Sequence, residues 1–290
     1  MSLFKPRYPY FFAANLIILA ELLSFAAYFF PWLQPYLLAA SFLAVFLLSL
    51  FNLELGLLTA VVELVIGSKG HLFSADIFGF PASLRLAIWS ALMLASLIFI
   101  IRKGGRACWR EHGQSYHFWK PLLILSAFIA LAFGQGLINR HAPADILADG
   151  NAWLYLTLIL PILLVYQPAA AEKQKRLLSV FFLAVGWLSF KTLALLFIFS
   201  HNLAIVPDIY LWVRRSGIGE ITAMGGGWYR VFIQSQVYAP IAFFLILWPL
   251  MKAKDWSRGK KRLMVAALAI LLAVIIISMS RSFWLAFIVA

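Results

Sequence analysis

Two arginines in the second half of the chain have the chemistry to hold an anion. Arg230 follows Gly-Gly-Gly-Trp-Tyr directly, and Arg281 lies in Ser-Met-Ser-Arg between two apolar runs. A guanidinium stays charged at neutral pH and donates paired hydrogen bonds to phosphate oxygens. Near hydrocarbon it is unfavourable by roughly 3 kcal/mol or more unless it meets water, a partner or a ligand. The pair therefore indicates a phosphate-binding site. The alternatives are an interfacial arginine that reaches lipid phosphates at 230 and a plain turn at 281.

Five further residues are candidates for contact with the same ligand. Arg214 and Arg215 end a short amphipathic stretch that suits the membrane interface, where lipid head groups are their other partners. Lys69 lies in a Gly-Ser-Lys-Gly loop and is equally well explained as a solvated lysine. Gln234 and Gln236 can bond sugar hydroxyls or simply end the loop. All five are predicted as substrate-binding residues.

Ionisable residues inside apolar runs are the other candidates. Glu63 and Lys191 are functional candidates by their position, but a structural role, as a pair or in a wet cleft, is the favoured interpretation. Glu21 and Glu54 are placed near the ends of spans, where solvation is easy. The sequence has no nucleotide-binding loop and no His–Glu pair with metal spacing, and Cys108 is its only cysteine. We therefore expect no cofactor and no metal.

The elements that must position these residues are membrane helices. Hydrophobic residues form 64% of the chain and the mean hydropathy is +0.92, in continuous apolar runs rather than the alternation of barrel strands. We predict an all-α polytopic transmembrane bundle with nine full spans and a cut-off tenth from Ser282. The predicted spans are 9–30, 36–52, 54–67, 82–101, 120–138, 152–167, 177–200, 236–251 and 263–279.

The basic residues predict which ends of the spans face the cytoplasm. Most of the 24 lysines and arginines fall at 5–7, 102–120, 173–176 and 252–262, which places the N-terminus inside. The net charge of +13 is then explained by cytoplasmic loops rather than by nucleic acid. The first apolar run lacks a cleavage site and should remain as a span. The outer face holds Lys69, Arg85, Arg140, Arg214, Arg215, Arg230 and Arg281.

Two parts are expected along the chain. Residues 1–176 form an N-terminal scaffold of about six spans, and residues 177–290 form a core with a long outer loop at 201–235. Within that loop Pro207-Asp208 predicts a helix start capped by Asp208, and Gly225–Gly227 allows a sharp reversal. Because the chain stops inside an apolar segment, we expect it to be truncated at its C-terminus.

Three segments carry a family resemblance. Gly225-Gly-Gly-Trp-Tyr-Arg-Val-Phe-Ile-Gln-Ser-Gln-Val-Tyr238 resembles the arginine-bearing segment before a span in the O-antigen ligase and O-antigen polymerase family. Ser278-Met-Ser-Arg-Ser-Phe-Trp-Leu-Ala286 resembles that family's Ser-Arg segment. The stretch Glu63–Phe73, with Ser83-Leu-Arg85, is similar to bacterial polysaccharide polymerases. In motif terms the resemblance covers about residues 180–290.

The resemblance implies a metal-independent glycosyltransferase with a GT-C-like fold in the bacterial inner membrane, acting on the periplasmic face. Its donor is a glycan on undecaprenyl pyrophosphate, and its acceptor is a sugar hydroxyl on lipid A core or on a growing glycan. Arg230 and Arg281 correspond to the arginines that hold the pyrophosphate and act in catalysis. The family's acceptor-activating histidine has no counterpart before Ala290, so the fragment alone is expected to be inactive.

A transporter or flippase of lipid-linked oligosaccharides is the main alternative. Such a protein should carry charges along its whole path and often shows repeat symmetry. Here the cations near apolar runs gather on the outer side, which favours chemistry on that face. A non-catalytic scaffold remains a third hypothesis. The residues do not decide between a ligase and a polymerase. They also do not identify the sugars, the acceptor or the oligomeric state.

Overall fold

The computed structural model describes residues 9–77, 80–104, 119–142, 145–146, 150, 153–166, 171–252 and 256–289. Among the basic residues predicted to face the cytoplasm, Lys5, Arg7, Arg106, Arg110 and Lys254 lie outside these ranges. The chain forms two compact units. Unit 1 consists of Met1–Pro31, Val61–Leu72 and Arg176–Ala290, and unit 2 consists of Trp32–Ala60 and Phe73–Lys175. Unit 1 thus contains the whole predicted core together with two earlier segments.

Six helices among the described residues are long and apolar enough to cross a membrane. Continuous apolar runs fold this way because a helix satisfies its backbone polar groups internally, where lipid offers no hydrogen bonds. The prediction of a helical membrane fold is confirmed at this level. The six are α1 (Pro9–Phe29), α2 (Leu33–Phe51), α4 (Leu84–Arg102), α6 (Trp119–Ile138), α9 (Ala171–Ser200) and α11 (Tyr238–Lys252), the last extended by the turn η2 (Gln234–Val237).

The prediction of nine full spans is not confirmed. Helix α3 (Leu53–Ile66) has 14 residues and so spans about 21 Å, less than the roughly 30 Å of a bilayer core. The segment predicted at 152–167 is the short turn η1 (Tyr155–Leu158) followed by α8 (Ile159–Val165). Helix α12 (Arg258–Ile277) begins with Arg-Gly-Lys-Lys-Arg, which shortens its apolar part, and α13 (Arg281–Val289) has nine residues.

Unit 2 is built on the packing of α2 against α4. Between α3 and α4 the chain forms an antiparallel hairpin of β1 (Ser74–Ile77) and β2 (Phe80–Ser83). The Gln34 side chain accepts a hydrogen bond from the Ser74 amide at 3.1 Å, and the Ser83 hydroxyl caps α4 by accepting from the Leu86 amide. The indole of Trp89 donates to the Thr157 hydroxyl at 2.8 Å, which ties α4 to η1.

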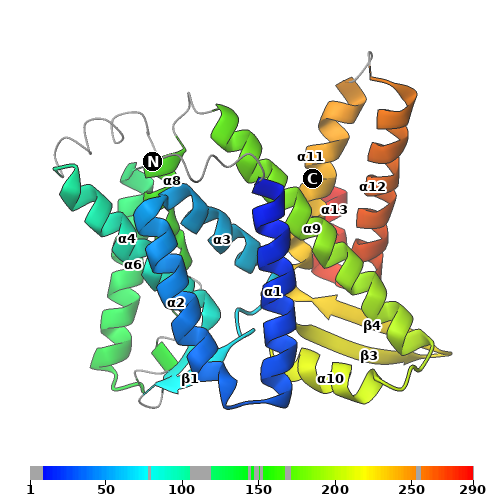
Figure 1. Cartoon of the computed structure of the whole chain (residues 1–290), viewed down its shortest axis with the longest axis horizontal. Helices are drawn as coiled ribbons and strands as arrows, with labels where there is room; N and C mark the ends of the chain where they lie inside the picture. Colours follow the sequence, from blue (N-terminus) through cyan, green and yellow to red (C-terminus); the bar gives the residue numbers. More distant parts are fainter. Residues whose placement is uncertain are drawn as a thin grey trace. The chain divides into compact units, whose positions relative to one another are not determined.

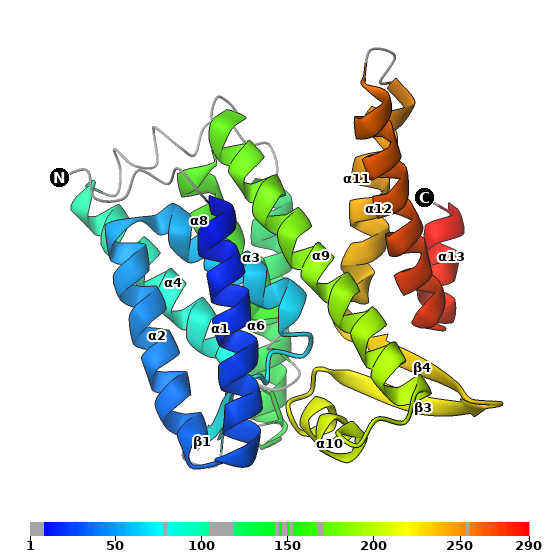
Figure 2. The same ribbon diagram turned by 45° about the vertical axis from the view of Figure 1, so that its right-hand side comes forward.

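Unit 1 contains the predicted outer loop, and this loop is folded. Helix α10 (Val206–Arg215) is followed by β3 (Gly219–Gly225) and β4 (Trp228–Ile233), which pair as an antiparallel hairpin. Figures 1 and 2 both show α10 and this hairpin at the C-terminal end of α9, with α12 on the other side of β4. The sequence predicted the reversal at Gly225–Gly227, whose φ angles are all positive, but not the two strands that it joins.

The start of α10 agrees with prediction and its cap does not. The helix begins at Val206 with Pro207 in its first turn, where the missing amide hydrogen is not needed. Asp208 lies inside the first turn rather than at the cap position, and no side chain caps the helix. Its carboxylate still interacts favourably with the positive end of the helix dipole, at the N-terminus of the helix. The face with Ile209, Trp212 and Val213 is buried.

Candidate functional site

The hairpin of unit 1 gives Arg230 its direction. Side chains alternate along a strand, and Val231 and Ile233 of β4 are fully buried on one face. Arg230 and Phe232 therefore share the other face, and Arg230 pairs in register with Thr222 of β3. The hairpin thus presents the guanidinium on the side from which α12 contacts β4.

Two contacts hold the Arg230 guanidinium in place. Its Nε donates a hydrogen bond to the carbonyl oxygen of Ser278 at 2.9 Å. Its Cζ lies 4.9 Å from the centroid of the Phe232 ring, and Phe232 stacks on Phe283 at 5.9 Å. No described residue accepts a hydrogen bond from the two terminal amino groups. The side chain is fixed at its base, and its paired donors are left for a ligand.

The turn between α12 and α13 is held by its own hydrogen bonds. The Ser278 hydroxyl donates to the carbonyl of Ile275 at 2.6 Å and accepts from the Ser280 amide at 3.3 Å. The indole of Trp284 also donates to the Ile275 carbonyl, at 3.0 Å. Met279 has a φ of 46°, in the left-handed region, so the chain reverses within this turn. Helix α13 then begins at Arg281.

The two predicted arginines therefore meet at one turn. Arg230 is bonded to Ser278, three residues before Arg281. The Arg281 side chain is exposed and makes no hydrogen bond or ion pair with any described residue. The amides that open α13 have no intrahelical acceptor and add partial positive charge at the same place. Two guanidinium-bearing residues and a helix start, all groups that favour phosphate, are thus brought to one turn.

The loop with Lys69 packs on the same unit. The amide of Gln234 donates to the Ser68 hydroxyl at 3.2 Å, and a β carbon on Gly217 would lie 3.5 Å from that of Lys69. Lys69 is exposed, and so is the Gln234 side chain. These two predicted ligand contacts lie on neighbouring segments and remain accessible.

Gln236 has a different environment from its neighbour Gln234. It is fully buried, and its amide is occupied within the protein. Its oxygen accepts from the Ile233 amide at 3.1 Å, and its nitrogen donates to the Thr192 hydroxyl at 3.1 Å and to the Val231 carbonyl at 3.2 Å. This placement is evidence against the predicted sugar contact. Gln236 instead ties the strand that carries Arg230 to α9.

We expect Gln236→Ala to lower the free energy of unfolding by about 2–3 kcal/mol, since it leaves buried polar groups without partners. The measurement is thermal unfolding of the purified protein in detergent. Gln234→Ala is the matched control, because the exposed Gln234 side chain makes no hydrogen bond with any described residue and its loss should leave the unfolding temperature unchanged. Equal effects of the two changes would contradict the assigned role of Gln236.

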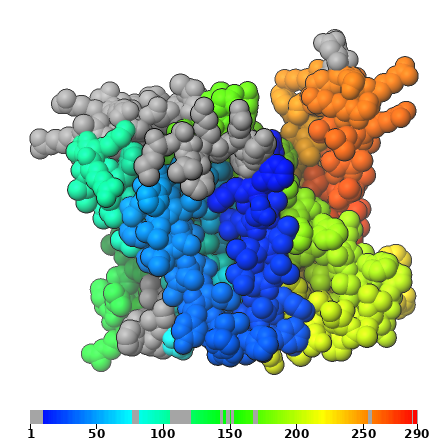
Figure 3. All heavy atoms as spheres, viewed as in Figure 1, coloured from blue at the N-terminus to red at the C-terminus, as the bar shows by residue number. Residues whose placement is uncertain are grey.

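Arg214 and Arg215 are not part of the turn. The Arg214 Nη1 lies 3.8 Å from the Glu220 Oε1 and its Cζ lies 5.9 Å from the ring centroid of Tyr210. The Arg215 Cζ lies 5.6 Å from the ring of Tyr28 on α1. None of these contacts involves Arg230, Arg281 or the turn between α12 and α13. Both are exposed at the end of α10, which lies beside α1 in Figure 3.

Sequence reasoning missed a buried ion pair that supports this region. The Lys191 ammonium of α9 lies 2.5 Å from the Glu21 Oε1 of α1, and both side chains are less than 10% exposed. The sequence suggested Glu63 as a partner of Lys191 and predicted that Glu21 lies near the end of a span. The structure corrects both expectations. The signal available was an isolated acid and an isolated base in two apolar runs.

Two tryptophans contact this pair, Trp187 of α9 and Trp212 of α10. The Trp187 indole donates to the same Glu21 oxygen at 3.1 Å, and the Lys191 Nζ lies 5.6 Å from the Trp212 ring. Trp212 donates to the Ser24 hydroxyl at 3.2 Å. The network therefore joins α1, α9 and α10, the elements around the hairpin that carries Arg230.

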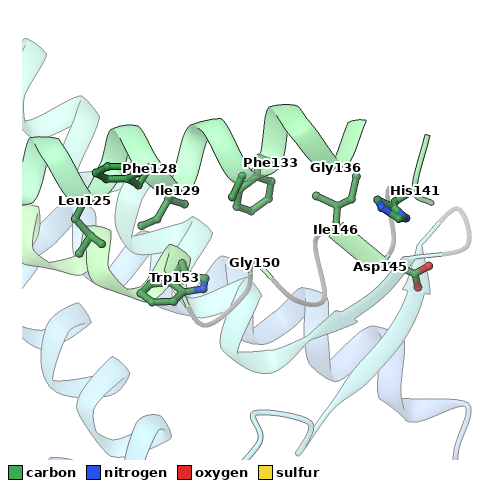
Figure 4. Close-up of a pocket in the computed structure, with 11 residues that line it drawn as sticks. Leu125, Phe128, Ile129, Phe133, Gly136, His141, Asp145, Ile146, Gly150 and Trp153 are labelled. Atoms are coloured by element: carbon green, nitrogen blue, oxygen red, sulfur yellow. The ribbon is translucent and has the colours of Figure 1, made fainter. Parts of the chain in front are cut away.

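Unit 2 has a groove of its own, of about 500 Å³, along α6. Figure 4 shows Leu125, Phe128 and Phe133 on its apolar wall, with His141 and Asp145 at one end. None of the predicted site residues lines it. No group of three or more His, Cys, Asp or Glu side chains in the described part of the chain is arranged to hold a metal ion.

Comparisons of the chain with protein-family models, with curated proteins and with solved structures found no match.

Proposed function

We propose that the chain is a GT-C-type glycosyltransferase of the O-antigen ligase or polymerase kind. It takes a glycan from undecaprenyl pyrophosphate on the periplasmic face of the inner membrane and transfers it to a sugar hydroxyl. The observation that carries the proposal is the turn at 278–281, where Arg230 is anchored with its paired donors open and Arg281 is exposed without a described partner. The resemblance of both arginine segments to that family supplies the reaction.

In the proposed reaction the acceptor hydroxyl oxygen bonds to the anomeric carbon of the donor sugar. The bond from that carbon to the pyrophosphate oxygen breaks, and the carrier pyrophosphate leaves with the bonding electrons. Negative charge grows on the pyrophosphate, so donors fixed in advance at that place lower the barrier. Arg230, Arg281 and the first amides of α13 take this role. The hydroxyl proton passes to a base, and we assign no described residue to it.

Arginine suits this role better than lysine. Its planar fork can bond two phosphate oxygens at once, whereas an ammonium acts as a point charge. The contacts of Arg230 with Ser278 and Phe232 fix that fork before the ligand arrives, so less ordering is needed on binding. Lys69 and Gln234, both exposed on neighbouring segments, complete the proposed ligand contacts.

Cysteine labelling from each side of the membrane tests the location of the site. In a Cys108→Ser background, a cysteine at Ser282 should react with an impermeant maleimide from the periplasm. The control, Lys103→Cys at the exposed end of α4, should react only after the inner membrane is opened. Labelling of Ser282→Cys from the cytoplasm alone would exclude the proposed function. Labelling from both faces would favour the transporter alternative, which needs alternating access.

A further inference from the structure

A second concave surface lies on unit 1, apart from the turn at 278–281. The groove has a volume of about 560 Å³ and is formed by the end of α9, by α10 and by the hairpin β3–β4. That volume is in the range of pockets that bind small ligands, roughly 300–1,000 Å³. Its floor and walls include Phe199, Tyr210, Arg214, Ile221 and Tyr229.

Three aromatic rings are gathered in this groove. The Phe199 ring lies 6.5 Å from the Tyr210 ring and 5.6 Å from the Tyr229 ring, measured between centroids. Phe199 is buried, while both tyrosines are partly exposed. Neither tyrosine hydroxyl has a hydrogen-bond partner among the described residues. Each tyrosine therefore offers an apolar ring together with a polar group that is still available.

Among the residues that line the groove, Arg214 is the charged one, and its partner Glu220 lies outside the lining. The guanidinium of Arg214 lies against the Tyr210 ring and 3.8 Å from the Glu220 carboxylate, and both charged side chains are about half exposed. An exposed pair at this distance is weak, so its donors and acceptors can bond other groups. The guanidinium donors of Arg214 match the hydroxyl oxygens of a sugar ring, which accept hydrogen bonds.

We propose that this groove binds pyranose units of a glycan. The apolar faces of the sugar rings stack on Tyr210 and Tyr229, and the sugar hydroxyls bond the tyrosine hydroxyls and the Arg214 guanidinium. This inference rests on the proposed transferase function and adds a subsite to it. A lipid acyl chain fits the geometry less well, because the groove carries a guanidinium and two tyrosine hydroxyls that have no partner among the described residues.

The position of the groove limits which sugars it can hold. Tyr229 and Arg230 are consecutive residues of β4, so their side chains point to opposite faces of the hairpin. A sugar bonded to a pyrophosphate at Arg230 is therefore not the one that stacks on Tyr229. The groove takes sugars further along the glycan of the donor, or the glycan of the acceptor.

The test is saturation-transfer NMR with the full chain in lipid nanodiscs. The probe is the surface polysaccharide of the producing cells, released from its lipid by mild acid. The double variant Tyr210→Ala/Tyr229→Ala should weaken binding about tenfold, equivalent to about 1.4 kcal/mol, because both ring contacts with the sugar are lost. The matched control is Tyr36→Ala, an exposed tyrosine of unit 2 outside the groove, which should bind as before. The double Tyr→Phe variant should keep most of the binding.

The outcomes separate this inference from the function on which it rests. Unchanged binding by the double alanine variant would refute glycan binding in the groove, whether or not the protein transfers glycan. Signals from nanodisc lipid in place of the polysaccharide overturn it as well. If glycan binding depends on the tyrosines but the protein has no transfer activity, glycan binding in the groove is supported and the proposed transferase function is refuted. In an active protein, a raised KM for donor or for acceptor identifies which glycan occupies the groove.

Discussion

Replacement of Arg281 by alanine is expected to lower glycan transfer by about 10²–10³-fold, the usual effect of removing one donor that stabilises transition-state charge. The residue lies at the start of α13, exposed and without a described partner, so its loss should not disturb folding. Arg281→Lys should recover little, because an ammonium cannot reproduce the paired hydrogen bonds of the guanidinium. The measurement is transfer of carrier-linked glycan in membrane vesicles from cells whose own gene for the protein carries the change.

Arg258→Ala is the matched control for this change. Arg258 is an exposed arginine at the first position of α12, at the other end of that helix from the turn with Ser278. The Arg258→Ala variant should transfer glycan as fast as the unchanged protein when the two are compared at equal amounts of membrane-inserted protein. Normal transfer by Arg281→Ala would refute the pyrophosphate role. Equal losses in both variants would show that the effect is a general one of surface charge.

Removal of the Glu21 carboxylate is expected to have the largest effect on stability. In Glu21→Ala the Lys191 ammonium remains buried between α1 and α9 without its counter-charge. Breaking a buried pair from one side typically lowers the free energy of unfolding by about 3–5 kcal/mol. The measurement is thermal unfolding in detergent, together with the amount of protein that accumulates in the membrane.

An exposed ion pair on α9, the helix that carries Lys191, is the control for Glu21. Glu172 and Lys175 lie 3.0 Å apart with more than 70% of each side chain exposed, so Glu172→Ala should not change stability measurably. Changing both Glu21 and Lys191 to Met should restore much of the loss, because no unpaired charge is then buried. If Glu21→Ala unfolds at the same temperature as Glu172→Ala, the pair does not support the fold.

The glutamines at 234 and 236 show the limit of sequence reasoning at the site. Both were predicted to bond sugar hydroxyls, because both carry the same amide and stand two residues apart. In the structure one is exposed, and the other is fully buried with three hydrogen bonds inside the protein. Their chemistry is identical, so only their position relative to the chain around them separates an accessible group from a structural one.

The helical membrane fold could be predicted because its cause is local. A run of apolar residues long enough to cross a bilayer must satisfy its own backbone, and only a helix does so within one segment. The reversal at Gly225–Gly227 was equally predictable, since positive φ angles favour glycine. Span length was predicted less well. The segment at 155–165 is shorter than the span predicted at 152–167, and the helix at 53–66 has the predicted length but is too short to cross a bilayer core.

By itself, the sequence determined that this is a helical membrane protein and which arginines are candidates for an anion site. Only the tertiary structure decided that Arg230 is anchored on the turn that leads to Arg281 and that Lys191 pairs with Glu21. The physical reason is distance along the chain. Arg230 and Ser278 are 48 residues apart, and Lys191 and Glu21 are 170 apart. Contacts of that kind depend on how helices pack, which neither hydropathy nor residue spacing encodes.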